Sequence, residues 1–353
     1  MQPNAPRLAG RSLSEVLHWS RGPARGAEQD SPSLEPPAAP AVGTGSTPEP
    51  PRPAEAAATP APAPVPGLDL WRQHFGLRGD PFSLTPDPEF LYPSTAHAEA
   101  LAGLQLGLWE RRGLTVMIGE VGTGKTTLVY SLLSRLDPQI ETAYLSNTLL
   151  TFDEILESAL DDFGVACPSR RRLDLQKALN GFLRQCAAQG KTAVLVIDEA
   201  QNLSDEVFER LRLLLNFETY KSKLLQVLLA GQPELAERLR QPNLRQIGDR
   251  VAIRCHLGPL SSAEAKRYIE HRLTTAGGSV DVFTRPALGL LIRKSRGIPR
   301  RINVLAHNAM LFAYGREIER VDWATVSQAA RELHSALPLT SPRDILPRLG
   351  ASS

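Results

Sequence analysis

Apolar residues recur in two distinct rhythms along the chain, and these rhythms alternate from about residue 94 to residue 260. Short, nearly continuous apolar runs, each with the length and composition of a buried strand, occupy 114–118, 140–146, 191–200, 224–231 and 250–257. The segments between them show helical spacing. Buried strands separated by helices predict an α/β fold, with a parallel sheet flanked by helices on both faces.

Helix starts are marked by capping signals in this region. Thr151 with Glu154, and Ser261 with Glu264, each place a hydroxyl three residues before a glutamate, which is the pattern of a capping box. A helix is also predicted over 94–111, because apolar residues recur there at helical spacing. Its apolar face consists of Ala98, Leu101, Leu104 and Leu108.

The two ends of the chain lack both rhythms, and only helical segments follow residue 260. Residues 1–67 hold about half of the prolines and much alanine, so they cannot bury enough apolar surface to offset the entropy of ordering. These patterns predict four parts: a disordered Pro/Ala-rich arm over 1–67, an α/β domain over 68–260, a small all-helical lid domain over 261–335 and a flexible tail over 336–353.

Composition narrows the classes of protein. The formal net charge of +2 over 353 residues argues against a dedicated nucleic-acid binder, which usually has a strong basic excess. The three cysteines have spacings that fit neither a zinc site nor a disulfide framework, as expected in a reducing compartment. No apolar run approaches the ~18 residues needed to span a bilayer. We therefore expect a cytoplasmic protein without a membrane span.

Residues 119–127 carry the pattern G-x-x-x-x-G-K-[ST] between an apolar strand and a helix. The glycines let the backbone curl so that successive N–H groups point at phosphates, and the helix N-terminus adds its dipole. The lysine reaches the β- and γ-phosphates, and the threonine hydroxyl after it is placed to bind Mg²⁺. The expected phosphate-binding loop consists of Gly119, Glu120, Val121, Gly122, Thr123, Gly124, Lys125, Thr126 and Thr127, with Thr126 as a metal ligand.

Two acidic residues, Asp198 and Glu199, end the apolar run at 191–200. Ligands of α/β sheets bind outside the carboxyl ends of the strands. We expect Asp198 to bind Mg²⁺, directly or through water, and Glu199 to orient and activate a water beside the γ-phosphate. A kinase needs no water-activating acid at this position, so Glu199 favours an ATPase.

Gln232 follows the apolar run at 224–231. We expect this strand to lie between the strand that leads into the phosphate-binding loop and the strand that leads to Asp198. Gln232 would then stand at the same edge of the sheet and could hydrogen-bond the γ-phosphate or the attacking water. The alternative is that Gln232 is only a turn residue before Pro233.

Two clusters of arginines complete the candidate site. Arg245 and Arg250 precede or begin the last apolar run, and Arg300 and Arg301 fall in the first turn of a helix in the predicted lid. An arginine that reaches the γ-phosphate contributes roughly 10³ to 10⁵ in rate. Such an arginine would make hydrolysis depend on closure of the lid or on a neighbouring subunit.

Taken together, the segments PFSLTPDPEFLY, GEVGTGKTT, VIDEAQNL, LAGQPEL and GIPRRIN make the chain resemble the AAA+ ATPases, and within them the ExeA/GspA-like secretion ATPases. The resemblance covers most of 71–335. It implies a P-loop NTPase that binds ATP and Mg²⁺, with Lys125 and Thr126 in Walker A and with Asp198 and Glu199 in Walker B.

The same resemblance implies further roles. Gln232 stands at the sensor-1 position, and Arg300 matches the sensor-2 arginine of the lid. Arg250, or in second place Arg245, lies in the region that supplies an arginine finger to a neighbouring subunit, so we expect a homo-oligomer. Phe82 and its neighbours are expected to help form the adenine pocket.

Secretion proteins of this type continue past the ATPase domain into a membrane span and a peptidoglycan-binding domain, neither of which this sequence shows. The resemblance therefore covers the ATPase module alone. The leading hypothesis is a Mg²⁺-dependent AAA+ ATPase that remodels or gates a protein assembly of secretion or of the envelope. It would be cytoplasmic and would reach the inner membrane through its partner.

Two alternatives stay open at this stage. One is a DNA-associated helper ATPase of the transposition type, for which the basic residues in 169–177 and 293–301 supply local charge. The other is a nucleotide-binding regulatory switch with little turnover, against which Glu199 argues. A small-molecule kinase is disfavoured, because no acceptor site is evident.

Overall fold

The computed structural model describes residues 7–8, 11–12, 70–85, 87–218 and 222–335 of the chain. The predicted arm and tail lie outside the described residues, apart from two short strands near the N-terminus. These strands, β1 (Arg7–Leu8) and β2 (Arg11–Ser12), pair antiparallel.

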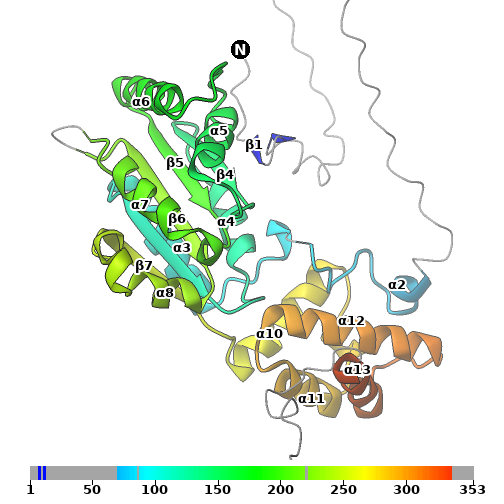
Figure 1. Ribbon diagram of the computed structural model, residues 1–353. Helices are drawn as coiled ribbons and strands as arrows, with labels where there is room; N and C mark the ends of the chain where they lie inside the picture. Colours follow the sequence, from blue (N-terminus) through cyan, green and yellow to red (C-terminus); the bar gives the residue numbers. More distant parts are fainter. Residues whose placement is uncertain (1–6, 9–10, 13–69, 86, 219–221, 336–353) are drawn as a thin grey trace, which may run out of the picture.

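The part of the chain up to residue 257 is built around a five-stranded parallel sheet (Figure 1), with the strands in the order β4–β5–β6–β3–β7. Strand β6 thus lies between β3 and β5, as predicted. Since all five strands are parallel, their carboxyl ends meet at one edge, where the candidate residues were expected. The strands are β3 (Leu114–Gly119), β4 (Ile140–Leu145), β5 (Thr192–Ile197), β6 (Leu225–Gly231) and β7 (Val251–Leu257).

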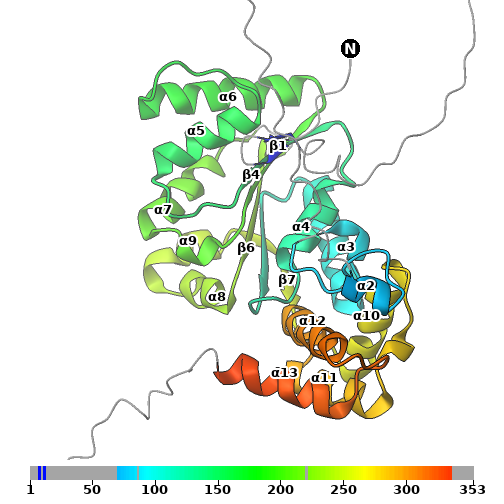
Figure 2. The ribbon, with the colours of Figure 1, turned by 90° about the vertical axis from the view of Figure 1, so that its right-hand side faces the viewer.

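Helices cover both faces of the sheet, as Figure 2 shows edge-on. Residues along β5 alternate between two apolar clusters, with Leu195 and Ile197 on one face and Val194 and Val196 on the other. The first face packs against α5 (Phe152–Asp162), α6 (Arg172–Ala188), α7 (Asp205–Leu214), α8 (Pro233–Leu239) and α9 (Arg245–Gly248). The second packs against α3 (Thr95–Trp109) and α4 (Lys125–Leu133).

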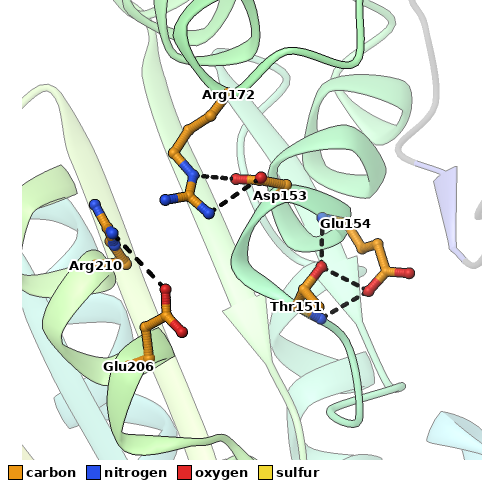
Figure 3. A network of polar contacts seen from close by, with 6 residues as sticks. All are labelled: Thr151, Asp153, Glu154, Arg172, Glu206 and Arg210. Carbon is orange, nitrogen blue, oxygen red and sulfur yellow. Dashed lines mark hydrogen bonds and ion pairs between the residues drawn. The ribbon is translucent and has the colours of Figure 1, made fainter.

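Hydrogen bonds fix the starts of α5 and α6 (Figure 3). Thr151 donates its backbone N–H to Glu154 Oε2 over 2.7 Å, and its hydroxyl accepts the N–H of Glu154, which confirms the predicted capping box. Arg172, the first residue of α6, donates from Nε to Asp153 Oδ1 over 2.6 Å. The start of α6 is thereby tied to the start of α5.

A separate group of helices follows the sheet and has its own apolar core. The predicted capping box of Ser261 and Glu264 opens its first helix. This core also takes in Trp71, Phe75 and Phe82 from the segment before α3, which the sequence analysis had assigned to the α/β domain. The helices are α10 (Ser262–Thr275), α11 (Arg285–Ser295), α12 (Pro299–Gly315) and α13 (Trp323–Ser335), and α2 (Leu70–His74) packs beside α12.

Helix α3 is the helix predicted over 94–111, but its buried face differs from the predicted one. Leu104 and Leu108 are buried as expected, whereas Ala98 is exposed and His97 is buried. The first turn of α3 lies against the loop that follows β3 rather than against the sheet, which explains why a polar side chain is buried there. Within the described residues, no helix combines the length and apolar character needed to cross a membrane.

Candidate functional site

The loop between β3 and α4 curls at two glycines. Gly122 (φ +81°) and Gly124 (φ +98°) both adopt backbone conformations that favour glycine. The backbone N–H of Arg300 donates to the carbonyl of Gly122 over 3.1 Å, and a Cβ added at Gly122 would lie 2.5 Å from Cβ of Arg300. The loop therefore lies directly against the first turn of α12, and Gly122 leaves room for that approach.

Lys125 opens α4 inside this curl, with only 5% of its surface exposed. Its ammonium group donates to the carbonyls of Gly119 (2.9 Å) and Glu120 (3.2 Å). Burial lowers the pKa of Lys125, while the negative charges of Glu199 and Asp198 act in the opposite direction. A cation is thus held at the centre of the predicted phosphate-binding loop.

Asp198, 3% exposed at the end of β5, accepts hydrogen bonds on both carboxylate oxygens. Its Oδ2 accepts from the hydroxyl of Thr126 over 2.7 Å and from that of Tyr144 over 3.2 Å, and its Oδ1 accepts from the N–H of Glu199 over 2.9 Å. Burial and the charge of Asp198 raise the pKa of Tyr144, so the phenol stays protonated and remains a donor.

The side chains of Thr126 and Asp198 fit a Mg²⁺ ion. They offer a hydroxyl and a carboxylate oxygen, and Mg²⁺ usually takes one or two such protein ligands, completing its shell with water and substrate phosphates. In the part of the chain that the structure describes, no group of three or more His, Cys, Asp or Glu side chains could hold a metal ion. Water and nucleotide phosphates would complete the shell of a metal held by Thr126 and Asp198.

Glu199 follows Asp198 in the left-handed conformation (φ +51°), which is uncommon for a residue other than glycine. Its Oε2 accepts from Nε2 of Gln201 over 2.6 Å and from Nε2 of Gln232 over 3.0 Å. Burial acts to raise the pKa of Glu199, but the two amide hydrogen bonds and the charge of Lys125 outweigh it and lower that pKa. The carboxylate is thus held ionised beside the loop.

Gln232 lies where the predicted strand order placed it, at the edge of the sheet beside Glu199. It is also the N-cap residue of α8, with Pro233 in the first position of the helix. Its backbone N–H donates to Oε1 of Gln201 over 3.1 Å. Gln201 was not singled out from the sequence, although its position two residues after Glu199 is a signal that could have been used.

His97 is a second residue that sequence reasoning missed. Its Nε2 lies 3.0 Å from the carbonyl oxygen of Thr123, and its Nδ1 lies 2.6 Å from Oγ of Ser94, the N-cap residue of α3. Because a carbonyl can only accept, Nε2 carries the proton and Nδ1 accepts from the serine hydroxyl. Burial lowers the pKa of His97, opposed by the Thr123 carbonyl and by Glu264.

The phosphate-binding loop and Glu199 line a pocket, and the rest of its lining, here called its far end, comes mainly from the segment before α3 and from α10 and α12. Phe82, predicted to help form an adenine pocket, does not line it; its ring is buried in the helical core and meets the ring of Phe283 edge-on at 6.3 Å. Residues that follow it in the sequence line the pocket instead. The lining at this end includes Ser83, Leu84, Thr85, Tyr268, Arg272 and Asn303.

Arg272 of α10 organises that end of the pocket. Its guanidinium donates to the carbonyls of Pro81 and Ser83 and lies 4.6 Å from the ring centre of Phe90. Tyr268 donates to Oδ1 of Asn303 over 2.8 Å. The segment before α3 is thereby bound to α10, and aromatic side chains from both lie beside the amide of Asn303 from α12 in the lining of the pocket.

The predicted arginines occupy different places. Arg300 lines the pocket, whereas Arg301, Arg245 and Arg250 do not. Arg250 lies just before β7, at the end of the sheet opposite the phosphate-binding loop, and donates to Oδ1 of Asn216 over 2.7 Å. The side chain of Arg245 is 79% exposed, with Asp249 at 3.6 Å.

A family model described as an AAA domain matches residues 109–239. General secretion pathway protein A of Aeromonas hydrophila is 43% identical over 265 residues, which cover 75% of this chain and 48% of that protein. This chain thus spans about half the length of that relative.

Two solved structures resemble the fold. The Aeropyrum pernix ORC2 protein gives a TM-score of 0.56 at 20% identity and covers 71% of each chain. Cdc6p of Pyrobaculum aerophilum gives a TM-score of 0.56 at 16% identity, over 71% of this chain and 70% of that one. At these identities the likeness shows the fold alone, a parallel sheet flanked by helices.

Proposed function

Because the AAA module of this chain belongs to the family of general secretion pathway protein A, we propose that the protein is a Mg²⁺-dependent ATPase that remodels or gates a partner assembly. The observation that carries the proposal is the place of Glu199, whose ionised carboxylate lies at the pocket of the phosphate-binding loop, between the amides of Gln201 and Gln232. A carboxylate so placed can accept a proton from water.

The chain's own residues divide the work of hydrolysis. The loop at 119–127 binds the phosphates of ATP through its N–H groups, and Lys125 neutralises their charge. Thr126 and Asp198 would hold Mg²⁺, which supplies further neutralisation of the phosphates when bound. Glu199 orients the attacking water and takes its proton, and Gln232 positions the same water or the γ-phosphate.

Arginines complete the site from two directions. Arg300 acts from the lid, because α12 begins against the loop and Arg300 lines the pocket. For the arginine finger of a neighbouring subunit, the exposed Arg245 is favoured over Arg250, which is held by Asn216. The proposal therefore includes a homo-oligomer in which each subunit completes the site of the next.

The parts of the chain are assigned accordingly. We propose that residues 68–260 act as the nucleotide-binding domain and 261–335 as the lid, and that the arm over 1–67 tethers the partner. The partner is proposed to be a protein assembly of secretion or of the envelope, by analogy with the relative named above. The protein would act in the cytoplasm and reach the inner membrane through that partner.

A trapped complex tests the function. In Glu199→Gln, ATP should bind without turnover, so a pull-down in ATP should retain envelope or secretion proteins. The matched control is Lys125→Ala, which should lose nucleotide binding and retain none of them. Equal retention by the two variants would contradict ATP-dependent engagement, and repeating the experiment without 1–67 tests the tether.

A DNA-associated ATPase is a second candidate, favoured by one observation. No acidic residue occurs from Arg285 to Arg316, and Arg293, Lys294 and Arg301 are exposed around the turn between α11 and α12. This surface could neutralise a phosphate backbone. DNA-stimulated turnover that falls steeply with salt would support it, whereas turnover unaffected by single- or double-stranded DNA would remove it.

A further inference from the structure

The side chain of Gln201 bridges the ends of two strands. Gln201 belongs to η3 (Ala200–Asn202), the turn after β5, and its Nε2 donates to Oε2 of Glu199 over 2.6 Å. Its Oε1 accepts the backbone N–H of Gln232, just beyond β6, over 3.1 Å. Glu199 and Gln232 are therefore joined twice, once directly and once through Gln201.

The backbone on both sides leaves room for this bridge. A Cβ added at Gly231, the last residue of β6, would lie 2.9 Å from Oε1 of Gln201 and would disturb the contact. On the other side, Glu199 adopts the left-handed conformation that directs the chain into η3. The left-handed conformation of Glu199 and the close approach of Gly231 therefore both favour the position that the Gln201 side chain occupies.

Arg238 holds the turn that carries Gln201. Its guanidinium donates to the carbonyls of Gln201 (2.7 Å) and Leu203, and pairs with the carboxylate of Asp205 at the start of α7. Arg238 belongs to α8, whose N-cap residue is Gln232. The same short helix therefore contacts η3 from both of its ends.

We propose that Gln201 is a positioning residue for ATP hydrolysis, which holds the carboxylate of Glu199 toward the attacking water, and that Arg238 fixes the turn from which Gln201 acts. The inference rests on the proposed ATPase function and deepens it. Both side-chain hydrogen bonds of Glu199 within the described residues end on Oε2, so Oε1 is left to act as the base.

This arrangement determines which bonds form and break during hydrolysis and where the proton goes. The water oxygen forms a bond to the γ-phosphorus, and the bond from that phosphorus to the bridging oxygen breaks, with its electron pair leaving on ADP. The proton lost by the water passes to Oε1 of Glu199. A carboxylate free to rotate would spend part of its time out of reach of that water, and a misplacement of about 1 Å can cost roughly 10²-fold in rate.

Two substitutions in the full chain test Gln201. Gln201→Met keeps the length and removes both donor and acceptor, whereas Gln201→Glu keeps the size and removes the donor to Glu199. For each variant we would measure kcat, KM and the dissociation constant of a fluorescent ATP analogue, and confirm folding by thermal melting. The expected result is a fall in kcat of about 10- to 100-fold with KM and the dissociation constant within about two-fold of wild type.

If Gln201 acts through Glu199, the effects of substituting the two residues should not add. In a Glu199→Gln background, Gln201→Met should cause little additional loss, because the group that it positions is already gone. A structural role would instead lower the melting temperature and leave the rate per folded molecule unchanged. Should one of the two Gln201 variants fail to fold, the other carries the same test.

Arg238 has a matched control in Asn243, whose Nδ2 donates to Oδ2 of the same Asp205 over 2.6 Å but has no hydrogen bond to the turn within the described residues. Arg238→Met should lower kcat by about ten-fold, and Asn243→Ala should leave it unchanged. A kcat within about two-fold of wild type in both Gln201 variants would overturn this inference alone. A wild-type chain that does not hydrolyse ATP would overturn the proposed function as well.

Discussion

Thr126 and Asp198 lie 72 positions apart in the sequence, and the hydroxyl of Thr126 donates to Oδ2 of Asp198 over 2.7 Å. The contact joins the end of the β3 loop to the end of β5, although β6 lies between these two strands in the sheet. A hydroxyl and a carboxylate this close can share one cation. The fold itself thus brings together the two proposed ligands of Mg²⁺.

Asp198→Asn keeps the shape of this contact and removes its charge. A charged partner contributes about 1.5–3 kcal/mol, so nucleotide affinity in Mg²⁺ should fall by roughly 10- to 150-fold, toward the wild-type value in EDTA. The measurement is a fluorescent-ATP titration with and without Mg²⁺. The control is Asp153→Asn, because Asp153 does not line the pocket and instead accepts a hydrogen bond from Arg172 (Figure 3). An equal loss of metal-free affinity in Asp198→Asn would contradict the metal-ligand role.

Gly122→Ala should separate backbone strain from the contact with α12. Gly122 and Gly164 both have positive φ, at +81° and +72°. A Cβ added at Gly122 would clash with Arg300, whereas no described atom lies within 4 Å of a Cβ added at Gly164. Each substitution should lower the free energy of unfolding by about 1–2 kcal/mol. Only Gly122→Ala should also weaken nucleotide binding, because its methyl group displaces Arg300. Urea denaturation and nucleotide titration check the two effects, and equal affinities in the two variants would contradict the account.

His97 should make stability depend on pH. Burial lowers its pKa in the folded state, so the unfolded chain, with a histidine pKa of about 6.5, binds the proton more readily. The contribution is fully present above that value and is lost as the pH falls below it. The melting temperature of wild type should therefore fall more steeply between about pH 7.5 and 5.5 than that of His97→Gln. His256→Gln, at an exposed position on β7, is the control; parallel curves for wild type and His97→Gln would contradict the prediction.

Arg245 should act on the site of a neighbouring subunit. Arg245→Ala should lower the ATPase rate by roughly 10³-fold or more, and mixing it with Lys125→Ala should restore part of the activity, because mixed oligomers contain some complete sites. Arg250→Ala, which loses the bond to Asn216, should have the smaller effect on rate. Activity per wild-type subunit should also rise with protein concentration. A rate that stays constant down to nanomolar protein would count against a shared site.

The sequence predicts the parts of the site whose chemistry is local. The phosphate-binding loop and the pair Asp198–Glu199 are contiguous stretches, and their residue types alone predict what they bind. Gln232 needed one further step, the order of the strands, which the alternation of strand and helix rhythms supplied. Its place beside Glu199 follows from β6 lying between β3 and β5.

The contacts of three other side chains could not be predicted, because their partners are backbone atoms far away in the sequence. Gln201 accepts from an N–H 31 positions away, Arg238 donates to a carbonyl 37 positions away, and His97 contacts a carbonyl 26 positions away. Composition cannot distinguish these side chains from solvated ones. Phe82 shows the opposite case, since the family resemblance implied a place in the adenine pocket and the ring is buried against Phe283.

We propose that Glu199 makes this nucleotide site one of hydrolysis rather than of binding alone. The most direct measurement is single-turnover release of phosphate from γ-labelled ATP, with enzyme in excess, by wild type and by Glu199→Gln. We expect a fall of about 10²- to 10⁴-fold in the variant, with the dissociation constant for ATP within about two-fold of wild type. Equal rates of phosphate release by the two proteins would contradict it.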